Sequence, residues 1–247
     1  MFLISSRVKC IKKIRMKKVS IFVEGQTERI FVEKLLSEYF TSGKLKTVSC
    51  KLIGERLTKI LELGNNINPE FYVLIFDVGG GERAVSVMLE RADAMIDSQG
   101  YNFLFALRDL NPELIANKNA LIAKIERLFA NYAFKDRMRF ILAIKEIEAW
   151  FLGDYNLFSR INPSLTPQYI QRHTGYNLIN DNPEDYDRPA QIIDEILQLI
   201  GQRYKKKAKD AYRITHRIDY SFLCVDVLAK VRSFAYFLNC IDQSISN

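Results

Sequence analysis

The chain has 247 residues, of which 48% are hydrophobic and 26% are charged, as in an ordinary globular protein. This length accommodates one large domain, or one domain with a substantial addition. No run approaches the roughly 18 apolar residues of a membrane span, so we expect no membrane insertion. The four cysteines lack metal-ligand spacing and there are only two histidines, which argues against a zinc site and a Ser-His-Asp triad.

The net charge of +7 comes from one end of the chain. Residues 1–18 hold seven Lys and Arg and no acidic residue, so residues 19–247 are electrically balanced. Nucleic-acid contact would therefore have to come from local patches and a bound metal. Residues 1–15 precede a second methionine, Met16, and lack a signal-peptide core. We interpret them as an upstream extension, or alternatively as a basic arm or weak targeting sequence, of a cytoplasmic protein.

The first predicted elements are a buried strand at residues 19–23 and a helix at residues 26–40. The strand is an apolar, β-favouring run, and the helix repeats apolar residues every three or four positions. Glu24 therefore lies at the carboxyl end of a strand, where open α/β sheets bind ligands. Glu28, in the first helical turn, lies on the same side, where the helix dipole favours its charge. The alternative is that Glu24 is a solvated loop residue.

The following segments alternate between strand and helix patterns. Strands are predicted at residues 47–53, 71–76, 101–107 and 139–144, and helices at residues 55–63, 82–98 and 119–132. The run at 71–76 is apolar throughout, which is typical of a central parallel strand covered on both faces. The alternation predicts an α/β domain over residues 16–155, with a mainly parallel sheet flanked by helices.

Four of the predicted strands end in an acidic residue: Glu24, Asp77, Asp109 and Glu146. Right-handed crossovers bring the carboxyl ends of parallel strands to one edge, so we expect these acids to share a site. Glu146 and Glu148 point the same way if the last strand continues through them.

Each of these acids also has a simpler interpretation. Glu146 and Glu148 would be favoured by the dipole if they merely begin a helix. Asp109 would cap a turn together with Asn111 and Pro112. The glycines at 79–81, which follow Asp77, would either contact a phosphate through their N–H groups or only form a turn.

The sequence Val23-Glu24-Gly25-Gln26-Thr27-Glu28 resembles the first motif of toprim domains, particularly of defence-associated relatives near the overcoming-lysogenization-defect nucleases. The resemblance covers about residues 17–155. It implies a toprim-like fold that binds Mg²⁺ through acids at strand ends and cuts or joins phosphodiesters. The family's Asp-x-Asp motif is incomplete here, because the candidates are Asp77-Val78-Gly79 and Asp109-Leu110-Asn111. The stretch at 146–149 resembles the late acidic motif of these relatives.

Together these features predict the roles of individual residues. We expect Mg²⁺ or Mn²⁺ to bind Glu24 and Asp77, with further ligands from Asp109, Glu146 and Glu148. Which of Asp77 and Asp109 is the principal ligand stays open. Catalysis is expected from Glu24, Asp77 and Glu146, while Lys145 or Arg108 offsets negative charge in the transition state.

Residues 156–247 are predicted to form an irregular and helical extension that packs on the core. Helices are expected at residues 167–174, 189–200 and 220–240, and the rest of 153–188 is expected to be irregular. The basic and aromatic segment 204–217 would grip a nucleic-acid backbone, or alternatively would form a solvated helix face. The candidate contacts are Lys205, Lys206, Lys207, Arg213 and Arg217.

The favoured function is a metal-dependent toprim nuclease that cleaves DNA or RNA. By resemblance it would serve anti-phage defence beside an ATPase of the AAA or ABC type encoded nearby, since this chain has no P-loop motif. The alternative is a catalytically inactive toprim-fold subunit that regulates or binds within an ATPase complex. A weaker option is phosphoryl or nucleotidyl transfer to a small substrate. A homo-oligomer is compatible with each interpretation.

Overall fold

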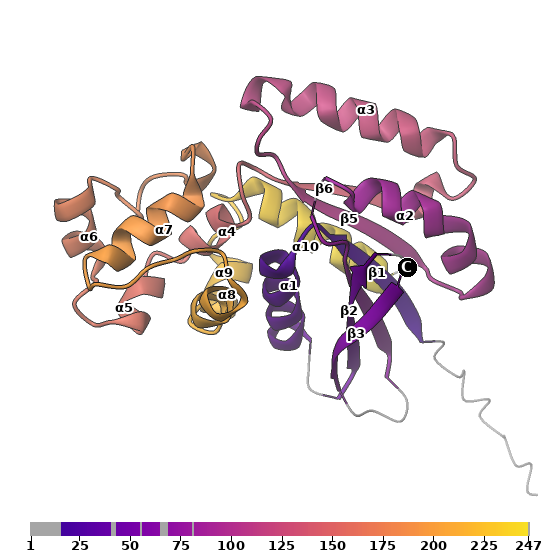
Figure 1. Ribbon diagram of the computed structural model, residues 1–247, viewed down its shortest axis with the longest axis horizontal. Coiled ribbons are helices and arrows are strands. Elements are labelled where there is room, and N and C mark those ends of the chain that lie inside the picture. Colours follow the sequence, from indigo (N-terminus) through magenta and orange to yellow (C-terminus); the bar gives the residue numbers. More distant parts are fainter. Residues whose placement is uncertain (1–15, 41–42, 55, 65–68, 81, 247) are drawn as a thin grey trace, which may run out of the picture.

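A computed structural model describes residues 16–40, 43–54, 56–64, 69–80 and 82–246, so the predicted basic extension at 1–15 lies outside them. A six-stranded sheet has the order β3-β2-β4-β1-β5-β6 (Figure 1). Its strands are β1 (Lys17–Val23), β2 (Leu45–Ile53), β3 (Arg56–Leu63), β4 (Phe71–Asp77), β5 (Phe103–Asp109) and β6 (Met138–Ala143). Of the strand pairs in the described chain, β2 with β3 is antiparallel and the other four are parallel. The predicted α/β class with a mainly parallel sheet is confirmed.

The edge strand β3 corrects the sequence analysis, which predicts a helix at residues 55–63. Leu57, Ile60 and Leu63 imitate a helical stripe by their spacing, but all three are more than a third exposed. The ladder between β2 and β3 skips Ile60, because Leu61 pairs with Ser49 and Lys59 with the next residue of β2. This bulge puts apolar residues three apart on an exposed strand, and the spacing therefore misleads.

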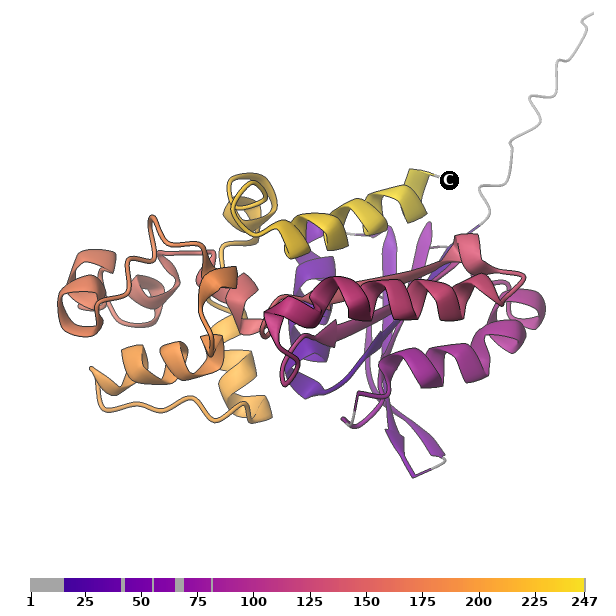
Figure 2. The same ribbon diagram turned by 90° about the horizontal axis from the view of Figure 1, so that it is seen from above.

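Helices cover both faces of the sheet (Figures 1 and 2). One face packs against α1 (Gln26–Tyr39) and α10 (Arg232–Ser246). The other packs against α2 (Ala84–Asp93), which continues as a π-helical turn (Ala94–Ser98), and α3 (Lys118–Ala130). Successive side chains of a strand alternate between the two cores, as Ile21 and Phe22 do. Among the described helices, none is long and apolar enough to cross a membrane.

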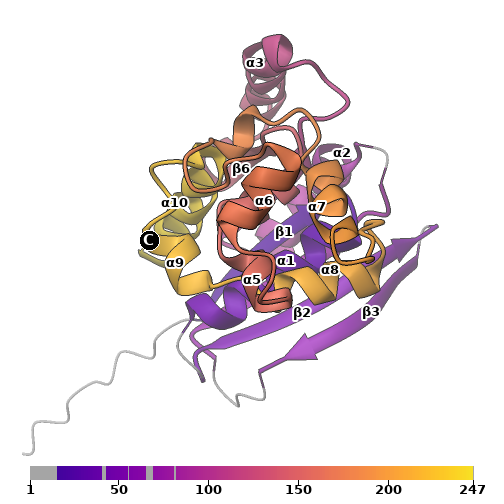
Figure 3. The same ribbon diagram turned by 90° about the vertical axis from the view of Figure 1, so that its left-hand side faces the viewer.

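The C-terminal region is helical and lies against α1 (Figure 3). It contains α4 (Glu148–Leu152), α5 (Leu157–Ile161), α6 (Pro167–Thr174), α7 (Pro189–Gln198), α8 (Ala208–Thr215) and α9 (Tyr220–Val225). Short 3-10 turns lie at Ile115–Asn117, Lys135–Arg137 and Pro183–Asp185. The bounds of α6 match the predicted helix, and residues 153–188 hold more helix than predicted. The predicted single helix at 220–240 is wrong, because a break separates α9 from α10.

Trp150 joins the C-terminal region to the sheet layer. Its side chain is fully buried, and its ring centroid lies 5.8 Å from that of Phe31, 5.3 Å from Phe234 and 5.6 Å from Phe237. Its indole N–H donates to the Ser233 hydroxyl at 2.7 Å. Aromatic packing of this kind stabilises both partners. It also fixes the start of α4, and with it the acidic residues that precede Trp150.

Candidate functional site

The acids predicted at strand ends meet at one edge of the sheet. Strands β4, β1, β5 and β6 are consecutive neighbours and run parallel. Asp77 and Asp109 are the last residues of β4 and β5, and Glu24 follows β1 directly. Glu146 lies three residues beyond the end of β6, so β6 does not continue to Glu148, which instead begins α4. The predicted alternative, in which Glu148 starts a helix, is therefore the observed one.

Glu24 lies beside a buried arginine of β5. Its Oε1 atom is 3.9 Å from Arg108 Nε, is buried, and accepts no hydrogen bond within the described chain. Arg108 also pairs with Glu82 at 2.8 Å and donates to the carbonyl of Asp109. Burial raises the pKa of Glu24 to about 7 against the lowering effect of Arg108, and the charges of Glu28 and Glu82 raise it further. Glu24 is therefore a carboxyl group that lacks sufficient positive charge around it.

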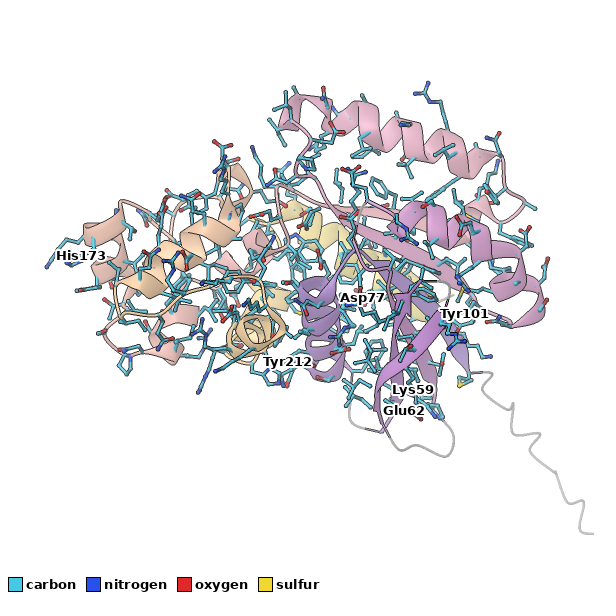
Figure 4. All side chains as sticks on the ribbon, in the orientation of Figure 1. Lys59, Glu62, Asp77, Tyr101, His173 and Tyr212 are labelled. Atoms are coloured by element: carbon cyan, nitrogen blue, oxygen red, sulfur yellow. The ribbon has the colours of Figure 1, made fainter. Side chains whose placement is uncertain are left out.

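Asp77 is held in an internal network with α1. Its Oδ1 accepts the N–H of Gly79 at 3.0 Å, and its Oδ2 lies 3.7 Å from Nε of Arg29, which pairs with Glu33. Figure 4 shows Asp77 in the interior of the molecule, beside α1. The N–H of Gly80 donates to the carbonyl of Glu24. Two of the glycine amides suggested for phosphate contact are thus engaged within the protein, and Gly81 lies outside the described residues.

A second group of acids surrounds the ammonium group of Lys206. Its Nζ lies 3.1 Å from Glu146 Oε1, 3.1 Å from Glu148 Oε2 and 3.9 Å from Asp109 Oδ2. Lys206 has a φ of 52°, in the left-handed region, and its carbonyl accepts a hydrogen bond from the side chain of Gln26. The start of α1 therefore holds the backbone that delivers this lysine. The sequence analysis predicts Lys206 as a nucleic-acid contact, whereas the structure places it among the acids.

Each of these three carboxylates is also held by a neutral donor. Asp109 Oδ1 accepts the N–H of Ile147 at 2.8 Å, and Glu146 Oε2 accepts the N–H of Ala190 at 2.9 Å. Glu148 Oε1 accepts the hydroxyl of Tyr204 at 2.8 Å. In each case, the other oxygen is the one nearest Lys206. The carboxylates are thus oriented by the fold and do not depend on Lys206 alone.

Glu28 connects the two groups of acids. It is only 8% exposed, and burial raises its pKa to about 7, with further raising by the charges of Glu148 and Asp77. The pKa of Asp109 is raised well above its usual range by burial and then by Glu28 and Glu148. Burial lowers the pKa of Lys206, but the surrounding carboxylates raise it overall. Around Lys206, the buried carboxyl groups therefore outnumber the positive charges.

A cavity of about 360 Å³ opens above the start of α1. Glu24, Glu28 and Lys206 line it, together with the backbone at Gly79 and the side chain of Lys51 from β2. A small ligand in this cavity would therefore contact both acidic and basic side chains.

The remaining basic candidates lie outside the acid groups. In the described chain, the side chain of Lys145 does not contact these acids and pairs instead with the exposed Asp187 at 2.7 Å. The positive charge that the sequence predicts from Lys145 is supplied by Lys206. Arg213 binds Gln202 and the carbonyl of Arg203. The other predicted nucleic-acid contacts, Lys205, Lys207 and Arg217, are exposed. Tyr212 of α8 lies near α1, as Figure 4 shows.

Three residues of the site, Glu28, Tyr204 and Arg29, have no role predicted from the sequence. Glu28 is four residues after Glu24, one helical turn along, and this spacing is a usable signal. Tyr204 and Arg29 carry no such signal, since each is identified only by a contact made through the fold.

The types of residue at the site suit a divalent metal, but their present arrangement does not. Carboxylate oxygens are the ligands that Mg²⁺ prefers, and Glu24 supplies a buried oxygen without a hydrogen-bond donor. In the part of the chain that the structure describes, however, no three His, Cys, Asp or Glu side chains are arranged to hold a metal. Lys206 lies among the acids, so metal binding would require side chains to rotate.

Comparisons with known proteins give one family. The model of the family described as "Domain of unknown function (DUF4276)" matches residues 23–242, which include every residue of the site. No curated protein matches the chain. A solved structure described as the "putative cell surface hydrolase from Lactobacillus plantarum WCFS1" is 16% identical, with a TM-score of 0.29. The match covers 52% of each chain, so this chain spans about half the length of that protein. At this TM-score we infer neither fold nor function from the likeness.

Proposed function

The chain belongs to the family described as a domain of unknown function (DUF4276), and from its site we propose that it is a metal-dependent nuclease. It would hydrolyse phosphodiester bonds of DNA or RNA. One observation carries the proposal: Glu28, Asp109, Glu146 and Glu148 interact electrostatically around the single ammonium group of Lys206 at the carboxyl edge of a parallel sheet.

The excess of buried carboxylates supports binding of a divalent cation. Buried carboxylates without sufficient positive charge either take up protons or bind a cation. The pKa values of Glu24 and Glu28 are both raised to about 7, so at neutral pH each group is close to the balance between these two outcomes. A divalent cation beside them would favour the charged form of both.

We assign the ligands to Glu24 and Glu28, which line the cavity, and to Asp109, which lies beside the lining residue Lys206. Glu24, Glu28 and Asp109 would hold Mg²⁺ or Mn²⁺, and the ion would polarise a phosphoryl oxygen and lower the pKa of a bound water. Lys206 and Arg108 supply fixed positive charge beside the cavity, which suits the charge that develops on a phosphoryl group. Glu146, Glu148 and Asp77 would act as positioning residues, the first two for Lys206 and the third for α1.

Lysines near the site suit a nucleic-acid substrate. Lys51 lines the cavity, while Lys205 and Lys207 lie in the segment that delivers Lys206. Such lysines bind phosphates without regard to sequence. By the toprim resemblance, the proposal extends to anti-phage defence in the cytoplasm, beside a partner ATPase of the AAA or ABC type.

The proposal is tested by cleavage of plasmid DNA, single-stranded DNA and total tRNA, with Mg²⁺ or Mn²⁺ present. The chain is assayed alone and with any ATPase encoded beside it. We expect Glu24→Gln to lower cleavage by a factor on the order of 10² or more. Glu38→Gln is the matched control, because Glu38 lies in the last turn of α1, at the other end of that helix from Glu24, and pairs with Lys34. Full cleavage by Glu24→Gln would place the active site elsewhere.

A second candidate function is a catalytically inactive regulatory or binding subunit. It is favoured by the fixed cations that already accompany the acids, namely Arg29 beside Asp77, Arg108 beside Glu24, and Lys206 among the rest. In such a protein these pairs would be structural. Absence of cleavage with every substrate, together with absence of Mn²⁺ binding, would favour this function.

A further inference from the structure

The second edge of the sheet is formed by β6, which lies between two helices. Among the described residues, β5 is the one strand that pairs with it, and β6 is the last strand in the sheet order. Helix α3 packs on one face of the sheet near β6, and α10 packs on the other (Figures 1 and 2). A groove of about 640 Å³ runs along this edge, and all three elements line it.

The groove has an apolar lining from each element. Phe140 and Leu142 come from β6, Ile122 and Phe129 from α3, and Tyr236 from α10. Tyr236 is 46% exposed, which is high for an aromatic side chain beside a core. The groove is distinct from the acid site, and none of its lining residues belongs to that site.

The shape of this groove suits a single extended chain. An edge strand offers unpaired main-chain N–H and C=O groups that a further strand can bind. Strand pairing requires an approach to about 4.8 Å. Because α3 and α10 form walls on both sides of the edge, a second sheet with its own covering helices would meet these walls before its edge strand reached β6. A segment one strand wide avoids that contact.

Positive charge lies at the rim of the groove without partners. Within the described chain, no ion pair or side-chain hydrogen bond is formed by Lys118, Lys135 or Arg232, and all three line the groove. Three acids also line the groove, namely Glu126, Asp136 and Glu184, against the four basic residues Lys118, Lys135, Arg139 and Arg232. Of these acids, Glu184 already accepts the N–H groups of Arg232 and Ser233. Lys135 lies just before β6, while Arg232 lies near Trp150, which follows β6. The basic side chains therefore flank both ends of the strand.

We propose that this groove binds an extended segment of a partner protein, which adds a seventh strand to the sheet beside β6. On one face, alternate apolar side chains of the segment would pack beside Phe140 and Leu142, and on the other face the intervening side chains would pack beside Tyr236. Acidic residues at its two ends would pair with the basic rim. Main-chain hydrogen bonds would supply affinity, and the apolar lining and the charges would supply specificity.

The test uses a fluorescein-labelled peptide, Glu-Val-Thr-Val-Thr-Val-Glu, titrated by fluorescence polarisation against the full chain. Ala130 is exposed at the end of α3 and lines the groove, so Ala130→Trp should fill the groove. Ala123→Trp is the matched control, because Ala123 is exposed on the same helix outside the groove. A peptide with alternate amides N-methylated keeps the apolar side chains but cannot form the ladder.

We expect saturable binding that Ala130→Trp weakens at least tenfold and Ala123→Trp changes less than twofold. The N-methylated peptide should also bind at least tenfold more weakly. Thermal unfolding of both variants checks that each is folded. No binding at about 1 mM peptide, or equal binding of the N-methylated peptide, would overturn the proposal. A dimer that forms without peptide and is dissociated by Ala130→Trp would assign the groove to a second copy and would also overturn it.

Discussion

At the scale of single residues, the acid site depends on a cation that is remote in the sequence. Lys206 lies 60 positions after Glu146, and its ammonium group donates a hydrogen bond to that carboxylate. The backbone of Lys206 is in the left-handed conformation. The positions of the acids could be predicted, because each follows an apolar strand. The partner of those acids could not be predicted, because a lysine in a basic run looks like a solvated residue until the fold brings it to the acids.

Raised carboxyl pKa values make stability depend on pH. Glu24 and Glu28 have pKa values of about 7 in the folded chain, against ordinary values of 4.5. The folded state therefore holds protons that the unfolded state releases between these values, so stability decreases as the pH rises through that window. The charged groups facing Glu24 are Arg108 from β5, Glu28 from α1 and Glu82 before α2.

We expect metal-free wild-type protein to be less stable at pH 8 than at pH 5, by roughly 1–3 kcal/mol from Glu24 alone. Glu24→Gln removes this contribution, so the variant should lose less stability over the same interval and should be the more stable protein at pH 8. Urea unfolding at the two pH values, with a chelator present, measures both. An identical pH dependence in the variant and the wild type would show that burial does not raise the pKa of Glu24.

At the scale of elements, the sequence predicted both bounds of a helix most closely where residues at its two ends fix where it begins and ends. The bounds of α6 could be predicted because Thr166 accepts the N–H of Tyr169 at 3.2 Å, Pro167 begins the helix and Gly175 ends it with a φ of 85°. Strand β3 has no such signals, and its structure follows from pairing with β2. The break between α9 and α10 likewise follows from packing, since Val227 and Val231 are buried against α4.

Close packing at that break gives a stability prediction. A Cβ atom on Gly153 would lie 2.6 Å from Val227 Cγ1, 3.1 Å from the Trp150 carbonyl oxygen and 3.3 Å from Val231 Cγ2. Gly153→Ala should therefore lower the free energy of unfolding by roughly 1–3 kcal/mol through overpacking.

Denaturant unfolding of three proteins tests this: Gly153→Ala, Val227→Ala and the double variant. The double variant should be more stable than the sum of the two single changes predicts, because Val227→Ala removes the nearest obstructing methyl group. Strictly additive effects would mean that the backbone moves and the contact with Val227 does not matter.

At the scale of the whole molecule, the acid site lies between two layers. Helix α1 packs against the sheet on one side and against α8 and α9 on the other, so nine of its residues are buried, including Glu28, Arg29 and Glu33. The sequence predicts an amphipathic helix with one polar face. Because the C-terminal helices cover that face as well, polar side chains at the start of α1 become internal, and they pair with acids of the strand ends.

This arrangement limits what could be predicted about the site. The sheet and its parallel strand ends follow from apolar runs and their alternation with helices. The division of the acids into an arginine-paired group and a lysine-centred group depends on contacts between segments that are far apart in the chain. Arg29 beside Asp77 and Lys206 beside Glu148 are two such contacts.

The measurement that tests the account most directly is calorimetric titration of the metal-free chain with Mn²⁺. We expect saturable binding that is lost in Glu24→Gln and retained in Glu38→Gln, whose substituted residue lies at the far end of α1. Binding that is equally strong in both variants would contradict it by placing the ion elsewhere. Absence of binding in the wild type would mean that Arg29, Arg108 and Lys206 already balance the acids.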